Sequence, residues 1–518
     1  MTRFRYEIEM ASDWHVGTGA SLPGHIDRLI ARDSDGLPYV PAKTVTGVWR
    51  DACETVARGF DGGKHGPWTR WVNCLFGDQP AEPTHSVSGP PRPAALKLRP
   101  AYFPPALRSV LCHPSEYSRQ YREFLTFRKP GVQIDDRTWV ARAGKLRVEE
   151  MARGSVTLVG EGSLSLDGLP EDAQRAVVFL LLAGARLVRR LGGKRRRGHG
   201  ACRLVVVDEA SLAGVGWEEL LNWAETNDPH EFPGIPSSPS AGKLVPVAAA
   251  GTSRGQRKDT GWVMVPLRLE ALLPLVAASR TVGNVVESMD FLPGTYLLPP
   301  LMGRLLELGL DEPTLRQALA AGDIIVLPAT PEVAGKRGLP IPFCLFQAKD
   351  RGIDQEPAYN RLIEPEPCGV QLKGFRDGFL NAGEADGAVY TKTRKTLRTH
   401  NSIHDVTQRP KREKDEAREG VGVYSYEAIA PGTVLRSELR LRSSIAERLA
   451  ELHPDWWAVL EGEYYVGRSK KDDYGLVRVV AEKPQSLPSL VDIEEPRQIV
   501  VWLTSPAILR SNTLRPSG

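Results

Sequence analysis

The sequence has 518 residues, which is too long for a single hydrophobic core, so we expect two or more domains. Hydrophobic residues make up 41% and charged residues 25%, as in ordinary globular proteins. The formal net charge is only +4, which excludes binding of a nucleic acid through overall charge. Any such site must come from local clusters of basic residues.

The six cysteines are scattered and form no Cys-x-x-Cys pair, which argues against a disulfide framework or a zinc ribbon. The longest apolar run, Ala176–Ala185, is about half as long as a membrane span requires. We therefore expect a protein with reduced thiols, a cytoplasmic location and no membrane partner.

The first half opens with strict alternation of apolar and charged residues over Phe4–Met10, which predicts a half-buried strand. A glycine-bearing loop over 13–19 follows. Helical spacing of apolar residues begins after Pro41, and Lys43 and Thr44 stand at the start of that helix, where free N–H groups can meet an anion. Residues 60–120 are rich in proline and glycine and indicate a loop or insertion.

The first half then ends with a strand–helix–strand pattern. Strands are predicted at Val156–Val159 and Leu164–Leu166, and a helix from Pro170 to about Leu191. A further strand is predicted at Arg203–Val207. Residues 226–260 are rich in Pro, Ser and Gly, as expected of a linker between domains.

The second half begins with a predicted strand at Trp262–Leu269 and a helix over Leu301–Leu310. Residues 373–420 are polar and basic and indicate a mobile loop. Ser444 and Glu447 form a potential capping box, which predicts a helix to about Leu460. The remaining predictions are strands at Asp323–Leu327, around a glycine loop within Tyr464–Val480, and at Ile499–Leu503.

Two loops combine glycine with basic residues. The first glycine loop, residues 192–200, reads GGKRRRGHG, and the second glycine loop, residues 467–475, reads GRSKKDDYG. Glycine lets the backbone approach a ligand closely, and the lysines and arginines supply charge for phosphates. A solvated basic turn is the alternative for either loop alone.

The two halves also repeat other features in the same order. Ile134–Thr138 is echoed by Ile403–Thr407, and Glu149 by Glu427. Gly154-Ser-Val is echoed by Gly432-Thr-Val at the same offset from the glutamate. We interpret this order as an internal duplication of a strand–helix–strand unit.

These residues resemble the RAMP superfamily, whose members are subunits of CRISPR effector complexes. The resemblance rests on His15–Gly19, Gly24–Arg28, the block 36–47 with Arg50, Leu75-Phe-Gly77, and the first glycine loop. Two such units in one chain most resemble the large RAMP subunit of subtype III-D complexes, the Csx-ten family. In the second half the match is looser.

The resemblance implies an α+β fold of two tandem ferredoxin-like (RRM-like) RAMP domains with long loop insertions. The predicted domains are 1–225 and 261–482, joined by the linker 226–260 and followed by a C-terminal strand and tail, 483–518. The implied partners are guide RNA, complementary target RNA, other RAMP subunits and a polymerase-type large subunit.

The implied function is binding of the guide RNA by its backbone, since guide–target pairing reads the sequence. The residues expected to contact RNA are His15, Lys43, Thr44, Arg50, Gly192, Gly193, Lys194, Arg195, Arg196, Arg197, Gly198, Arg468, Lys470 and Lys471.

Two catalytic alternatives remain open. In related backbone subunits, the aspartate at the position of Asp27 cuts target RNA with a divalent metal, which makes Asp27 with Mg²⁺ a candidate endoribonuclease site. His15 or His25 as a metal-free general acid or base is the other. A purely architectural subunit, whose basic loops meet acidic protein partners, is the remaining possibility.

Overall fold

The structure is a computed structural model of the chain. It describes residues 2–63, 66–77, 94–166, 168–207, 209, 212, 214–227, 261–349, 358–363, 369–375, 377–381, 389–401, 403–404, 409–410, 423–469 and 473–487. The chain divides into two compact units, Met1–Gly251 with Lys471–Asp473, and Thr252–Lys470 with Tyr474–Gly518. The predicted linker lies mostly outside the described residues, so its boundaries stay a prediction.

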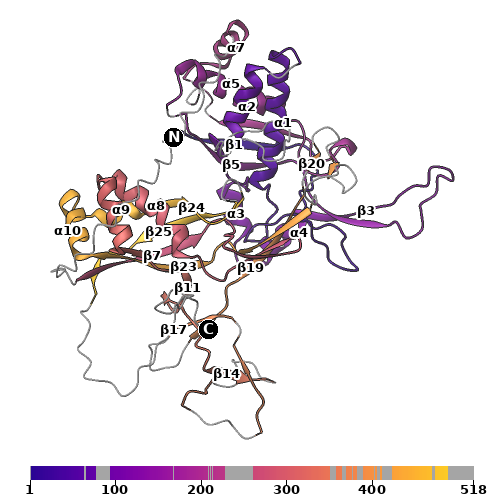
Figure 1. Cartoon of the computed structure of the whole chain (residues 1–518). Coiled ribbons are helices and arrows are strands. Elements are labelled where there is room, and N and C mark those ends of the chain that lie inside the picture. The colour runs from indigo at the N-terminus through magenta and orange to yellow at the C-terminus, as the bar shows by residue number, and fades with distance from the viewer. Residues whose placement is uncertain are drawn as a thin grey trace, which may run out of the picture. The chain divides into compact units, whose positions relative to one another are not determined.

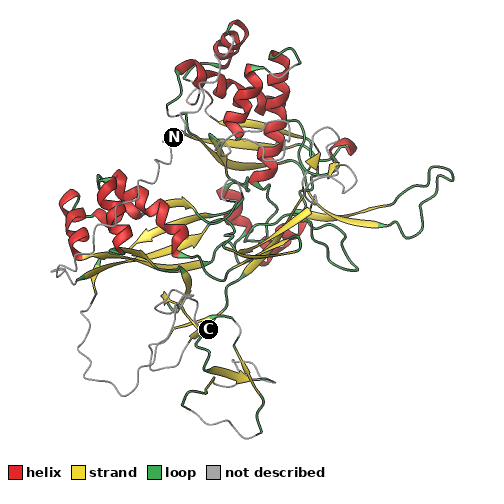
Figure 2. Ribbon diagram, in the orientation of Figure 1, coloured by secondary structure: helices red, strands yellow, loops and turns green. Residues whose placement is uncertain are grey.

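Unit 1 is built on a four-stranded antiparallel sheet in the order β2-β5-β1-β6. Strands β1 and β5 of this sheet are labelled in Figure 1. Helices α1 and α5 are the two crossover elements and lie on one face of this sheet (Figure 2). A β-α-β-β-α-β chain with this strand order is a ferredoxin-like fold, as predicted. The bounds are β1 Thr2–Met10, α1 Ala42–Phe60, β2 Leu96–Leu98, β5 Val156–Leu164, α5 Glu171–Leu187 and β6 Cys202–Val207.

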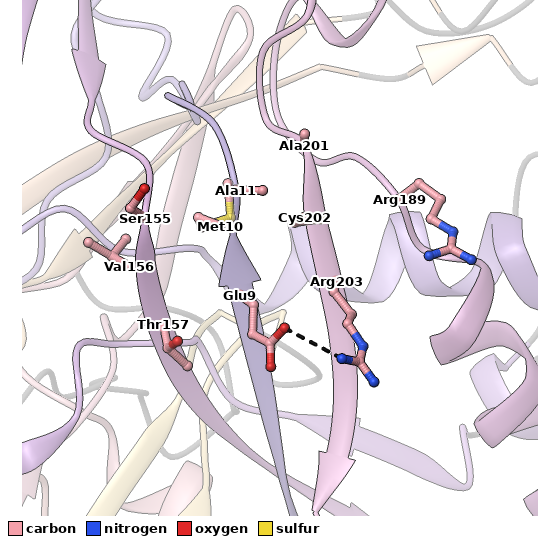
Figure 3. A pocket seen from close by; sticks show the side chains of 10 residues that line it. All are labelled: Glu9, Met10, Ala11, Ser155, Val156, Thr157, Arg189, Ala201, Cys202 and Arg203. Carbon is pink, nitrogen blue, oxygen red and sulfur yellow. Dashed lines mark ion pairs between the residues drawn. The ribbon is translucent and has the colours of Figure 1, made fainter.

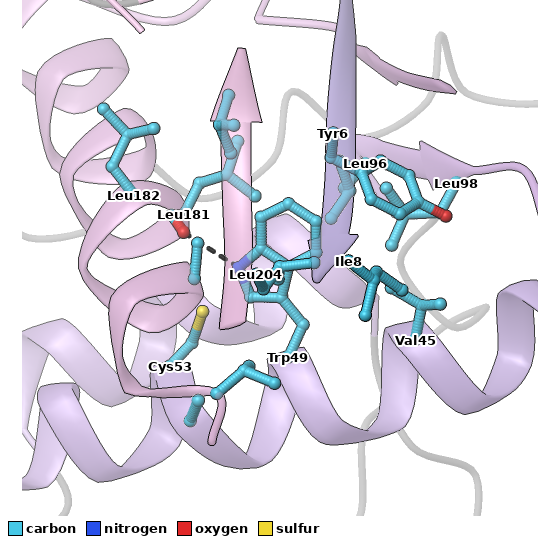
Figure 4. Close-up of a cluster of buried hydrophobic side chains, with 14 of the residues drawn as sticks. Tyr6, Ile8, Val45, Trp49, Cys53, Leu96, Leu98, Leu181, Leu182 and Leu204 are labelled. Carbon is cyan, nitrogen blue, oxygen red and sulfur yellow. Dashed lines mark hydrogen bonds between the residues drawn. The ribbon is translucent and has the colours of Figure 1, made fainter. Parts of the chain in front are cut away.

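The core of unit 1 lies between this sheet and its two helices (Figure 4). The fully buried Trp49 of α1 donates its indole N–H to the carbonyl of Leu181 in α5, at 2.8 Å. A Cβ on Gly184 would lie 2.3 Å from Sγ of Cys53, so the two helices pack closely there. The alternation seen in the sequence places Tyr6 on this buried face.

Unit 1 contains further elements where the sequence indicated a loop. The helices α2 and α3 each carry a proline in the first turn, a position where proline is compatible with a helix. The loop prediction for 60–120 was therefore wrong in part. The further elements are α2 Pro67–Phe76, α3 Pro105–Leu111, α4 Glu116–Phe124, β3 Thr126–Gly131, β4 Arg147–Ala152, the 3₁₀ turn η1 Arg195–Arg197 and α7 Trp217–Thr226.

Unit 2 repeats the ferredoxin-like arrangement. Its main sheet has the order β12-β11-β23-β7-β25-β24, in which β11-β23-β7-β25 corresponds to β2-β5-β1-β6 of unit 1. The two units therefore share the same fold, which confirms the internal duplication at the level of the fold. The bounds are β7 Trp262–Ala271, α8 Gly294–Glu307, α9 Glu312–Ala321, β10 Ile324–Val326, β11 Thr330–Val333, β12 Lys336–Arg337, β23 Val434–Arg442, α10 Ser443–Leu452, η2 Trp456–Leu460, β24 Gly462–Tyr465, β25 Leu476–Ala481 and β26 Gln485–Ser486.

Unit 2 has a second sheet, in the order β19-β22-β9-β8. Val276, which lies just before β8, forms a β-bridge with Arg468 of the second glycine loop, so this end of the sheet lies beside the loop. Its strands are β8 Ala278–Val282, β9 Val285–Ser288, β19 Lys395–Asn401 and β22 Val423–Ile429. Shorter strands are β13 Leu339–Pro340, β14 Leu345–Ala348, β15 Tyr359–Asn360, β16 Leu372–Gly374, β17 Phe379–Asn381, β18 Val389–Thr391, β20 Ile403–His404 and β21 Arg409–Pro410.

Two details of unit 2 differ from the sequence predictions, and a third lies outside the described residues. The segment 373–420 contains strands where a loop was expected. Helix α10 ends at Leu452, and its N-cap is Arg442 without a side-chain cap, so the capping box does not form. The strand predicted at Ile499–Leu503 lies outside the described residues.

Candidate nucleic-acid interface

The first glycine loop is anchored to the segment that follows β1. The backbone N–H of Gly193 donates to the carbonyl of His15 at 2.8 Å, and that of Gly200 to Asp13 at 2.9 Å. The N–H of Leu191 donates to the carbonyl of Gly200 at 2.9 Å, which closes the loop on itself. The loop is therefore a defined structure and differs from a loose basic turn.

The second glycine loop repeats these three hydrogen bonds. The N–H of Arg468 donates to the carbonyl of Val276 at 2.9 Å, and that of Gly475 to Pro274 at 2.9 Å. The N–H of Val466 donates to the carbonyl of Gly475 at 2.8 Å. The two loops are equivalent positions of the duplicated fold, as their sequences indicated.

The backbone conformation of the two loops explains why glycine stands at positions 192 and 467. Gly192 and Gly467 have φ values of 79° and 85°, which side chains rarely adopt. A Cβ on Gly192 would also lie 2.4 Å from the carbonyl oxygen of His15. The residues two places later, Lys194 and Ser469, have φ of 56° and 58°, so the loops turn in the same way.

Lys194 is paired with a buried carboxylate. Glu149 of β4 is 3% exposed and contacts the ammonium of Lys194, while Nη1 of Arg28 lies 3.4 Å from its other oxygen. Burial alone would raise the pKa of the Glu149 carboxyl, but hydrogen bonding to Lys194 and the charges of Lys194 and Arg28 hold it below its ordinary value. Lys194 thus ties the first glycine loop to the hairpin β3–β4.

Unit 2 has a corresponding glutamate. Glu427 of β22 stands at the position of Glu149 and accepts a hydrogen bond from the N–H of Ser288 at 2.9 Å. The cation paired with Glu427 is Lys395 of β19, whose Nζ lies 3.1 Å from Oε2 of Glu427. The same Nζ lies 2.7 Å from Oδ1 of Asp290. The glutamate is repeated in both units, but in the described part of the second glycine loop Ser469 stands at the position of Lys194.

His15 and His199 contact other residues of unit 1, whereas His25 is exposed. His15 is 9% exposed, and its Nδ1 lies 2.7 Å from the carbonyl oxygen of Glu150. Nε2 of His199 lies 3.0 Å from the ammonium of Lys129. Burial first, and then the charges of Lys129 and Lys194, lower the pKa of His199. His25 is exposed.

Asp27 is exposed and forms backbone contacts with β4. Its Oδ2 accepts a hydrogen bond from the N–H of Val148 at 2.7 Å, and its own N–H donates to the carbonyl of Val148 at 2.8 Å. Across the described residues, no group of three or more His, Cys, Asp or Glu side chains is placed to hold a metal ion.

Arg50 is engaged inside unit 1. Its guanidinium donates to Glu54 at 2.8 Å, to Asn73 at 2.7 Å and to the carbonyl of Gly77 at 2.9 Å. These contacts join α1 to the end of α2. Contact between Arg50 and RNA stays a prediction, and the observed partners give it a structural role.

The remaining candidates differ in exposure. Lys43 and Arg197 are exposed, and Thr44 and Arg195 are half-buried. Gly198 has φ of 85° in open space. In unit 2, Arg468 is exposed. The side chain of Arg196, together with Lys470 and Lys471, lies outside the described residues.

Sequence reasoning missed a basic hairpin with an exposed aromatic tip. Strands β3 and β4 and their connection, 126–152, project from unit 1 (Figure 1) and contain six basic and four acidic residues, a net charge of +2. All six basic residues lie within 128–147. Trp139 in the connection is 83% exposed with φ of 57°. The side chain of Asp135 accepts the N–H groups of Arg137 and Thr138, which orders the tip. The sequence signal that could have revealed this hairpin is the high density of Arg and Lys around Trp139.

An open pocket of about 430 Å³ lies at one end of the unit 1 sheet (Figure 3). Arg189 and Arg203 are among its lining residues, and Arg203 lies 3.9 Å from Glu9 across β1 and β6. Burial raises the pKa of the Cys202 thiol to about 11, which favours its neutral form. The lining also includes Met10, Ala11, Ser155, Val156, Thr157 and Ala201.

The family comparison covers most of unit 1. Residues 7–203 match the family model of the RAMP superfamily. This segment is similar to the RAMP superfamily. The match includes the first glycine loop, Asp27 and the hairpin β3–β4, so the matched segment contains every candidate site of unit 1 described above.

Solved structures with similar chains include two cryo-EM structures of the type III-B Cmr-β complex. The chain from the complex bound to cognate target RNA has 12% identity and a TM-score of 0.31, and the match covers 41% of this chain and 99% of that chain. The chain from the apo-state structure has 15% identity and a TM-score of 0.28, and the match covers 40% of this chain and 97% of that chain. No curated protein shows similarity to this sequence. Within the described residues, no helix has the length and apolar character to span a membrane.

Proposed function

We propose that this protein is a guide-RNA-binding subunit of a type III CRISPR effector complex, in which the two glycine loops bind the RNA backbone. The observation that carries this proposal is the repetition of the same closed loop in both units, in a chain whose residues 7–203 match the RAMP superfamily. The finer assignment to the subtype III-D large subunit, with other RAMP subunits and a polymerase-type subunit as neighbours, is part of the proposal.

The charge distribution supports backbone binding. Arg197 and Arg468 are exposed on the two loops, and the hairpin 126–152 adds a net charge of +2. Arginine and lysine bind phosphates without regard to sequence, whereas reading of sequence requires contacts to base edges. A subunit in a complex where guide–target pairing reads the sequence needs only the phosphate contacts.

The test replaces Arg195 and Arg197 together by alanine in the full chain. Binding of guide RNA is measured over a range of salt concentrations. We expect weaker binding and a decrease of roughly one to two in the slope of log affinity against log salt, because each lost phosphate contact removes about one unit.

The matched control is Arg316→Ala, since Arg316 is an exposed arginine on α9, away from both glycine loops in sequence. It should leave affinity and slope unchanged. Equal behaviour of the loop variant and the control would contradict the proposal. Recovery of partner subunits without RNA after nuclease treatment would instead support the architectural alternative.

A further inference from the structure

An aromatic cluster lies beside the second glycine loop. His400 of β19 stacks on Tyr424 of β22 with ring centroids 5.2 Å apart and planes at 29°. Tyr426 lies 5.3 Å from Tyr424 and 5.7 Å from Tyr474 of the loop. Nε2 of His400 lies 2.6 Å from the hydroxyl of Tyr474. We call His400, Tyr424, Tyr426 and Tyr474 the aromatic cluster.

Strand register places these rings on one face. Arg398 is opposite Tyr426 and His400 is opposite Tyr424 across β19 and β22, so their side chains share a face of the sheet. Tyr474 is 3% exposed and is the buried base of the cluster. His400, Tyr424 and Tyr426 are half-buried, so part of each ring reaches the surface.

Two arginines accompany the rings. The guanidinium of Arg468 lies 5.8 Å from the ring centroid of Tyr426, and that of Arg398 lies 5.9 Å from that of Tyr474. Glu427, the acidic neighbour of Tyr426 in β22, is on the opposite face with Lys395. Aromatic rings flanked by guanidinium groups match the chemistry of an unpaired nucleotide, which has a π face and a phosphate.

The corresponding position of unit 1 has different chemistry. The residue before the last glycine of the loop is His199 in unit 1 and Tyr474 in unit 2, and each contacts the neighbouring hairpin. Its partner in unit 1 is Lys129, whereas in unit 2 it is His400. The duplicated site is therefore basic in one unit and aromatic in the other.

We propose that the aromatic cluster of unit 2 is a stacking site for one unpaired base of the bound RNA, with Arg468 and Arg398 contacting its phosphates. This deepens the proposed function and rests on it: the first glycine loop binds backbone alone, and the second also selects single-stranded RNA. Base stacking on tyrosine and histidine is independent of sequence, because every base has a π face.

The test compares Tyr424→Leu with Tyr424→Phe in the full chain. The probes are a single-stranded RNA that carries 2-aminopurine at successive positions and a blunt RNA duplex of the same length. We expect Tyr424→Leu to weaken binding of the single strand by about 5- to 150-fold, the usual value of one base–aromatic stack, and to leave the duplex unaffected. Quenching of 2-aminopurine should be lost in Tyr424→Leu and kept in Tyr424→Phe.

Phe343→Leu is the matched control, because Phe343 is 95% exposed in unit 2 but lies outside the cluster. It should behave as the unmodified protein. Three results would overturn the stacking site: equal losses for single strand and duplex, equal losses for Phe343→Leu, or loss of a protein partner with RNA binding intact. In the last case the cluster is a protein interface. The proposed function fails separately, if the Arg195 and Arg197 variant binds RNA normally.

Discussion

At the scale of single residues, Glu149 joins three segments that are distant in sequence. Its carboxylate contacts Lys194 of the first glycine loop and Arg28 of the loop that precedes α1. A buried charge is stable only with such partners, since removal of one leaves an uncompensated group. The sequence repeat pointed to Glu149 and Glu427, but it did not show which cations would meet them.

We expect Glu149→Gln to lower the free energy of unfolding by about 1–3 kcal/mol at pH 7, because Lys194 and Arg28 lose their anion. The pKa of Glu149 is lowered in the folded protein. Its contribution is therefore complete above the unfolded value of about 4.3 and is lost as the pH falls through the folded pKa. Urea unfolding at several pH values measures this, and Arg119→Ala, at an exposed helical pair, is the control. A variant as stable as the unmodified protein at pH 7 would contradict it.

At the scale of elements, we expect the glycines of the first loop to differ in how strongly their replacement destabilises the fold. Gly192→Ala should cost about 2 kcal/mol or more, because alanine meets both a φ of 79° and the carbonyl of His15 at 2.4 Å. Gly198→Ala, with φ of 85° in open space, should cost only about 1 kcal/mol. Thermal unfolding and RNA affinity are measured for both, and equal effects would show that the close approach to His15 does not matter.

Sequence patterns predicted those elements whose signals are local. The strand Thr2–Met10 follows from alternation, and the duplication follows from equal offsets between Glu149 and Val156 and between Glu427 and Val434. Helices α2 and α3 were missed because their prolines stand in the first turn, where they do not break a helix.

The aromatic cluster escaped detection for a different reason. Its rings come from β19, β22 and the second glycine loop, which only the folded chain brings together. The basic stretch around His400 suggested a loop in the sequence, since its lysines and arginines obscured the alternation of a strand. Tertiary pairing with β22 decided its structure.

At the scale of the whole molecule, the question is whether this chain cuts RNA or only binds it. Asp27 is exposed, its Oδ2 is hydrogen-bonded to the N–H of Val148, and no described acidic or histidine cluster joins it. A carboxylate in this position is suited to hold the loop 24–28 against β4. The hydrogen bond to Val148 gives Asp27 a structural role in unit 1.

We therefore expect Asp27→Ala in the assembled complex to leave the products from labelled complementary RNA unchanged, with Mg²⁺ or with EDTA. The guide should remain bound. The variant should instead lose about 1 kcal/mol of stability, because the N–H of Val148 loses its acceptor. Asp27→Asn separates charge from hydrogen bonding, since its amide oxygen can still accept that N–H. If one Mg²⁺-dependent product disappears in both variants while guide binding persists, Asp27 is a nuclease residue and the scaffold assignment is wrong.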